Sequence, residues 1–148
     1  STIGDTGKYC SLAVVSGIPC VAFQNSSMGS LELVVAQNAD GSVWNTSTTV
    51  VGSGMVGGYI KLLEVGGCPG IAFEDMTASD LAYIHAKDAQ GSDWDSVVLV
   101  DTPGNTGQFT SGVVMLDGRP ALTTVEMFAG EVRYLLANDA AGSDWPQP

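Results

Sequence analysis

Basic residues are scarce in this sequence. Only 5 Lys and Arg stand against 16 Asp and Glu in 148 residues, with a single His, so the formal net charge is -11. Binding to nucleic acid or to an anionic membrane surface requires clustered basic side chains that neutralise phosphates. We therefore expect no nucleic-acid partner and no membrane partner.

Cysteines are also few. Cys10, Cys20 and Cys68 leave one thiol over in any pairing and lack C-x-x-C spacing. We therefore expect no disulfide framework and no zinc site, but three buried, reduced thiols. No apolar run has the length of a membrane span, and Ser1 begins a polar segment. These features predict a soluble protein without a signal peptide, located in the cytoplasm, outside the cell or in a virion.

Glycine, by contrast, is abundant. The sequence contains 19 glycines among short runs rich in valine and leucine, and 45% of its residues are apolar. Such runs predict short strands joined by tight turns. A chain of this length fits one core, so we expect a single all-β domain.

One short stretch occurs three times, as NADGSVW at 38–44, DAQGSDW at 88–94 and DAAGSDW at 139–145. The segments around it repeat at the same interval, so that the whole chain divides into three units. A repeat of this length with four strands is typical of propeller blades. The units are 1–51, 52–101 and 102–148, with strands expected at 11–15, 21–23, 31–36, 48–51, 61–65, 71–73, 81–86, 97–100, 113–116, 121–124 and 132–137.

The runs GDTGKYCSLAVVSGIPCVAF (4–23) and SLELVVAQNADGSVW (30–44) resemble the repeats of bacterial β-propeller proteins of the BNR or Asp-box-like kind. The resemblance covers nearly the whole chain and implies a β-propeller of three four-stranded blades, the last without its outer strand. Three blades do not close a ring, so we expect a six-bladed homodimer in which residues 1–5 of a neighbouring chain continue the last blade. The alternative fold is a β-trefoil, which also has three repeats of this length.

The hairpin layout places two kinds of connection at opposite ends of the blades. The tryptophan turns and the G-x-P turns share one end and are nearly identical among the units. The connections at the other end differ among the units, so we expect any ligand there. The candidate ligand-binding residues are Gln24, Asn25, Glu74, Asp75, Asn105 and Glu126. Three of these, at the ends of second strands, have a second interpretation, in which they cap turns by accepting backbone hydrogen bonds.

Other residues have structural interpretations. We expect Trp44, Trp94 and Trp145 to pack between blades as structural turns, with sugar stacking as the alternative. His85 is expected to be a structural residue of its strand, not a general base. We expect no metal and no cofactor.

These patterns predict a noncatalytic binding module that is lectin-like, with a glycan or a protein as ligand. The alternative is a structural or protein-interaction scaffold without a small ligand. A sialidase-like hydrolase comes third, because Arg119 and Arg133 are too few for its arginine cluster.

Overall fold

The computed structural model describes residues 4–52 and 54–147, and these residues form eleven strands and no helix. All strand pairs are antiparallel and join neighbours in the sequence, which gives three separate sheets. The first sheet contains β1 (Thr6–Val15), β2 (Ile18–Asn25), β3 (Ser30–Val35) and β4 (Thr48–Val51). The second sheet contains β5 (Val56–Val65), β6 (Cys68–Asp75), β7 (Asp80–His85) and β8 (Val98–Asp101). The third sheet contains β9 (Gln108–Val114), β10 (Pro120–Glu126) and β11 (Glu131–Leu136).

The all-β prediction is thus confirmed. Most strands extend beyond the predicted ranges, and β1 and β5 begin five residues earlier than expected, at Thr6 and Val56. In the third sheet, β9 ends before Met115, which the sequence placed inside a strand. The N–H of Met115 donates to the carbonyl of Arg119 at 2.9 Å, so this residue closes the turn instead. The predicted continuation of the last blade by residues 1–5 of a neighbour lies partly outside the described residues.

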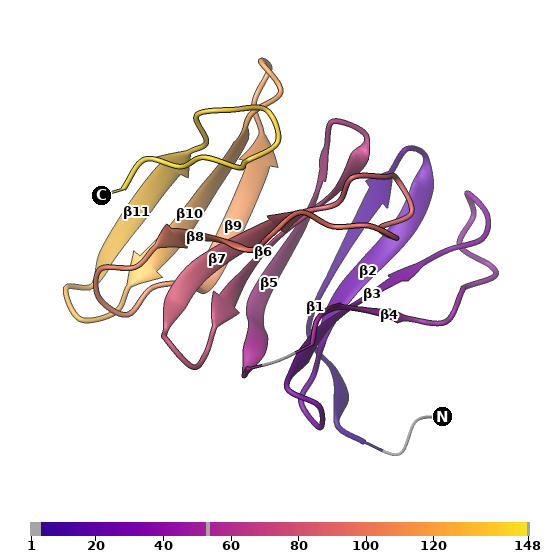
Figure 1. Ribbon diagram of the computed structural model, residues 1–148, viewed down its shortest axis with the longest axis horizontal. Coiled ribbons are helices and arrows are strands. Elements are labelled where there is room, and N and C mark those ends of the chain that lie inside the picture. The colour runs from indigo at the N-terminus through magenta and orange to yellow at the C-terminus, as the bar shows by residue number, and fades with distance from the viewer. Residues whose placement is uncertain (1–3, 53, 148) are drawn as a thin grey trace.

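The three sheets lie side by side, with β5 against β1 on one side and against β9 on the other (Figure 1). The hairpins sort the connections into two ends. We call the end that carries the β2–β3, β4–β5, β6–β7, β8–β9 and β10–β11 connections the loop end. The opposite end, which carries the tryptophan stretches, is the turn end.

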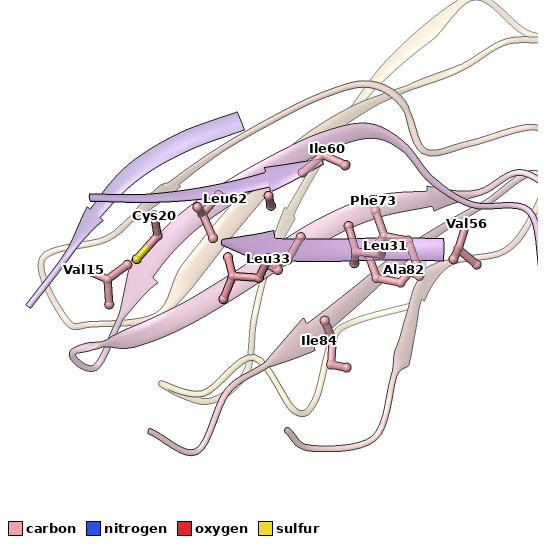
Figure 2. Close-up of a cluster of buried hydrophobic side chains, with 12 residues drawn as sticks. Val15, Cys20, Leu31, Leu33, Val56, Ile60, Leu62, Phe73, Ala82 and Ile84 are labelled. Carbon is pink, nitrogen blue, oxygen red and sulfur yellow. The ribbon is translucent and has the colours of Figure 1, made fainter. Parts of the chain in front are cut away.

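The core fills the two spaces between the sheets. Side chains alternate between the faces of a strand, and we call the face toward the next sheet the forward face and the other the backward face. The forward face of the first sheet and the backward face of the second form one cluster (Figure 2), which contains Val15, Cys20, Leu31, Leu33, Leu62, Phe73 and Ile84. The second cluster joins the second and third sheets and contains Leu63, Val65, Leu81, Tyr83, Leu122, Leu135 and Trp145.

The expectation of three buried thiols is wrong for Cys10, which is exposed. Cys20 is buried in the first cluster and Cys68 is half-buried. Cys10 lies on the backward face of the first sheet, whereas Ile60, which occupies the equivalent position in the second sheet, is 7% exposed between two sheets.

The described residues include no helix long and apolar enough to span a membrane.

Candidate functional site

Backbone hydrogen bonds join the connections of the loop end to one another. In the β6–β7 turn, the N–H of Met76 donates to the carbonyl of Met55 at 2.7 Å. The β8–β9 connection contacts the same β6–β7 turn, because the N–H of Thr106 donates to the carbonyl of Ser79 at 2.8 Å. The β4–β5 and β8–β9 connections, which join one sheet to the next, are therefore each hydrogen-bonded to a turn of the sheet that they leave and to a turn of the sheet that they enter.

The predicted residues that end the second strands use their side chains to cap the following turns. Asn25 Oδ1 accepts from the N–H of Met28 at 3.2 Å, and Asp75 Oδ1 accepts from the N–H of Thr77 at 2.9 Å. Glu126 is buried, and its carboxylate accepts from the N–H groups of Ala129, Asn105 and Phe128 at 2.6, 3.1 and 3.1 Å. These hydrogen bonds favour the ionised form and lower the pKa of Glu126.

The other predicted residues lie between sheets. Gln24 is 2% exposed, and its Nε2 donates to the carbonyl of Val56 in the next sheet at 2.9 Å. Glu74 is 4% exposed and accepts from Gln108 Nε2 at 3.2 Å. Burial raises the pKa of Glu74, and the hydrogen bond from Gln108 opposes this shift only in part. Asn105 lies in the β8–β9 connection, and its backbone carbonyl accepts from the N–H of Met127 at 2.9 Å. The structure brings three of the six residues together, because the N–H of Asn105 donates to Glu126 and Gln108 Nε2 donates to both Glu74 and Asn105. Gln24, Asn25 and Asp75 form other hydrogen bonds of the loop end.

A row of three aromatic rings lies near the loop end of β1, β5 and β9, which we call the inner strands because β5 contacts both of the others. Tyr9 on β1 and Tyr59 on β5 have ring centroids 5.1 Å apart, and Tyr59 and Phe109 on β9 have centroids 5.0 Å apart. Tyr9 is 39% exposed and Phe109 is 61% exposed. We call these three residues the aromatic row. Tyr59, between the other two rings, is half-buried.

A bulge at each inner strand sets the direction of these rings. Tyr9 and Cys10 together oppose a single residue of β2, and the register shifts at the equivalent place in the other two sheets. Tyr9, Tyr59 and Phe109 have φ angles of 51°, 44° and 53°, in the left-handed region. A side chain in that region costs about 1–2 kcal/mol. An aromatic residue with a left-handed φ angle thus recurs at the equivalent place in all three sheets, and strain of this kind is common at binding surfaces.

The tryptophan stretches at the turn end are stabilised by their leading side chains. Asp88 accepts from the hydroxyl of Ser92 at 2.7 Å and from nearby backbone N–H groups, and these bonds lower its pKa. The indole of Trp145 donates to Gly142 O at 2.7 Å, and that of Trp94 donates to Gly91 O at 2.9 Å. Trp145 is 4% exposed against the second sheet, Trp94 packs against the first cluster, and Trp44 is 38% exposed.

A cavity of about 280 Å³ opens at the turn end between the second and third sheets. His85 lies in it, with Nε2 3.1 Å from the carbonyl of Val65 and Nδ1 3.6 Å from a carboxylate oxygen of Asp95. The hydroxyl of Tyr83 is buried there without a partner among the described residues. The equivalent space between the first two sheets, about 170 Å³, presents Val35 in place of the histidine.

Sequence reasoning missed the aromatic row as a surface. The signal was present, since Tyr9, Tyr59 and Phe109 recur at intervals of 50 residues. An aromatic residue at the start of a strand ordinarily indicates core, however, and the bulges that lie at these three positions leave no mark in the sequence. Comparisons of the sequence with protein-family models and with curated proteins give no match.

Proposed function

We propose that the chain is a noncatalytic β-propeller module that binds a glycan at its loop end. In this proposal each sheet is a blade, and further blades complete the ring. The meander within each sheet and the contact of β5 with both β1 and β9 support blades over a trefoil. Fold alone does not choose a ligand, so the choice depends on the surface at the loop end.

The aromatic row is the single observation that carries the glycan. Its three rings are close together and are held by strained backbone at equivalent places in three sheets, with Tyr9 and Phe109 exposed and Tyr59 half-buried. Aromatic rings present flat apolar faces with polar edges, which match the apolar faces and hydroxyl groups of sugars. Two of the three rings carry hydroxyl groups, those of Tyr9 and Tyr59, which can bond to a sugar hydroxyl.

The absence of catalysis is part of the proposal. Asp75 and Glu126, which end β6 and β10 at the loop end, accept backbone N–H bonds, and the lowered pKa of Glu126 keeps it ionised. A general acid in glycoside hydrolysis needs the opposite, a raised pKa. Burial raises the pKa of Glu74 and of Asp80, but Glu74 is buried against Gln108 and Asp80 is half-buried beside the carboxylates of Asp75 and Asp101.

A glycan array followed by calorimetry on the best ligand tests the proposal. Tyr59→Ala removes the central ring of the row, and we expect it to weaken binding at least tenfold. Leu116→Ala is the matched control, since Leu116 is a fully exposed apolar residue at the turn end. A folded chain that binds no glycan on the array would contradict the proposal.

The alternative function is a scaffold that binds no small ligand. The observation that favours it is the use of all six predicted ligand residues in hydrogen bonds within the chain. A scaffold predicts that Tyr59→Ala changes stability alone, with no ligand lost from the array.

A further inference from the structure

The two boundaries between sheets are built in the same way. At the second boundary, Trp145 packs on Tyr83 with ring centroids 5.5 Å apart. At the first boundary, Trp94 packs on the first cluster, and a methyl group on Gly91 would come within 2.6 Å of Leu33 Cδ2. Leu33 and Tyr83 are equivalent residues of β3 and β7, 50 residues apart. In both cases the tryptophan turn of one sheet covers the forward face of the sheet before it.

The two outer faces carry the same parts without a cover. Tyr134, the equivalent of Tyr83, is 60% exposed on the forward face of the third sheet, whereas Tyr83 is 1% exposed. Leu12, on the backward face of the first sheet, is 66% exposed, whereas its equivalent Leu62 is 1% exposed. Trp44 is 38% exposed, and no other sheet of the described residues packs against its turn.

Both outer faces are apolar in a strongly acidic chain. The forward face of the third sheet presents Ser111, Val113, Met115, Val132 and Tyr134, and the backward face of the first sheet presents Cys10, Leu12, Val14, Val21, Phe23 and Val34. Glu32 also lies on the backward face, but it is 7% exposed and bonded by Ser30 and Thr49. Contiguous exposed apolar surface of this kind marks an interaction site.

We propose that the forward face of the third sheet docks on the backward face of the first sheet of a second copy of this chain, with Tyr134 against Trp44 of that copy. A second copy is the partner that fits, because each of the two internal boundaries already joins a forward face of one sheet to the backward face of the next. This inference rests on the blade arrangement of the proposed function, but not on its ligand.

Polar contacts of the internal boundaries have equivalents at the new one. Ser11 Oγ accepts from the N–H of Leu62 at 3.0 Å at the first boundary. Ser111 occupies the position of Ser11, so its hydroxyl accepts from the N–H of Leu12 in the second copy. At the loop end, the carbonyl of Ser79 accepts from Thr106 N–H at 2.8 Å. Gly130 occupies the equivalent position in the turn of the third sheet, so in the docked pair its carbonyl accepts from the N–H of Thr6 at the start of β1 of the second copy.

The contact joins two different faces, so it is head to tail. Such contacts form rings when the rotation closes. Two copies together have six sheets. In the closed pair, the forward face of each copy's third sheet packs on the backward face of the other copy's first sheet. A contact between identical faces would leave the other face of each copy exposed.

Two variants and their mixture test this arrangement by light scattering. Tyr134→Arg places a charge on the forward face of the third sheet, and Leu12→Arg places one on the backward face of the first sheet. Both positions are exposed in the single chain, so we expect arginine to be tolerated there. We expect the wild type to have about twice the chain mass of 15.2 kDa, and each variant alone to have the chain mass. The mixture keeps one intact pair of faces, and we expect it to recover the doubled mass with weaker affinity. Leu99→Arg, at an exposed position of β8, is the control and should keep the doubled mass.

Three results would overturn the proposal. The first is a wild type at the chain mass, the second is a Leu12→Arg variant that keeps the doubled mass, and the third is a mixture that stays at the chain mass. Hydrogen exchange on the wild type checks the result without substitutions, since protection should rise with concentration at β1 and β11. A doubled mass without glycan binding would contradict only the ligand, and a monomer that binds glycan would contradict only the docking.

Discussion

Tyr83 and Trp145 meet edge to face across the boundary between the second and third sheets, with ring planes 64° apart. The tyrosine belongs to β7 and the tryptophan to the turn after β11. Both side chains are buried, and burial raises the pKa of Tyr83. Trp145 therefore acts as a clamp that holds the third sheet against the second.

Loss of this clamp should destabilise the chain strongly. We expect Trp145→Ala to lower the free energy of unfolding by about 3–5 kcal/mol, because it leaves a cavity against Tyr83. Phe128→Ala is the control, since Phe128 is 82% exposed, and it should cost less than about 0.5 kcal/mol. Urea unfolding of both variants measures the difference. Equal losses would mean that the indole contributes no packing between sheets.

Gly142 lies under the same tyrosine, and a side chain there should clash. A methyl group on Gly142 would lie 2.6 Å from Tyr83 Cε1, whereas one on Gly118 would meet nothing within 4 Å. Both glycines have left-handed φ angles, of 72° and 86°, so alanine costs about 1–2 kcal/mol at either position. We expect Gly142→Ala to cost about 1–3 kcal/mol more than Gly118→Ala. Thermal and urea unfolding would contradict the packing if the two variants matched.

The ion pair between Arg133 and Asp101 should be costly to break. Arg133 Nη1 donates to both carboxylate oxygens at 2.8 and 3.0 Å, and Asp101 is 0% exposed. Arg133→Met leaves that carboxylate buried without its cation, so we expect a loss of about 3–5 kcal/mol in the free energy of unfolding. Lys87→Met breaks an exposed pair with Asp93 and should cost less than about 1 kcal/mol.

A double variant checks the cause of that loss. Val51 and Ala82 occupy the equivalent positions at the first boundary, where both belong to an apolar cluster. Asp101→Val combined with Arg133→Ala places this apolar pair at the second boundary. We therefore expect the free energy of unfolding to return to within about 2 kcal/mol of the wild-type value. A double variant as unstable as Arg133→Met would show that the ion pair itself, and not the unpaired carboxylate, determines the loss.

Glu126 should make the loop end sensitive to acid. Its pKa is lowered by the backbone N–H groups of Ala129, Asn105 and Phe128, so it lies below the pKa in the unfolded chain. The stabilisation is then complete above the unfolded pKa and is lost as the pH falls through the folded pKa. Glu126→Gln should therefore be less stable than the wild type at neutral pH, with a difference that shrinks in acid.

The matched control for this pH series is Glu64→Gln, at the turn end. Glu64 is exposed and accepts one bond, from the N–H of Ser16 at 3.0 Å, which an amide oxygen can also accept. Urea unfolding from neutral to acid pH should show the pH-dependent difference for Glu126→Gln alone. A constant difference across that range would contradict the role of the charged carboxylate.

The sequence predicted the all-β class and the order of strands because these depend on local chemistry. Gly118 and Gly142 take the left-handed φ angles that the turns need, and the apolar runs between such turns are the strands. The tryptophan stretches were recognisable because Asp88 and its equivalents bond to residues of the same stretch. Signals of this kind act over a few residues and survive in the sequence.

The rest of the site depends on contacts that no local pattern carries. Tyr9 has a left-handed φ angle that ordinarily requires glycine, so its outward ring was not expected. Asp75 and Glu126 end their strands with a carboxylate, which suits either a ligand or a turn cap, and only the positions of nearby N–H groups decide for the cap. Asp101 and Arg133 come from different sheets, so their pairing has no trace in the spacing of either repeat.

Small-angle X-ray scattering of the wild-type chain tests the central claim most directly, because one measurement reports both mass and shape. Docking of the third sheet on the first sheet of a second copy predicts a closed disc with about twice the chain mass of 15.2 kDa, unchanged on moderate dilution. An open, three-sheet particle at the chain mass, with Tyr134 and Leu12 still in solvent, would contradict it.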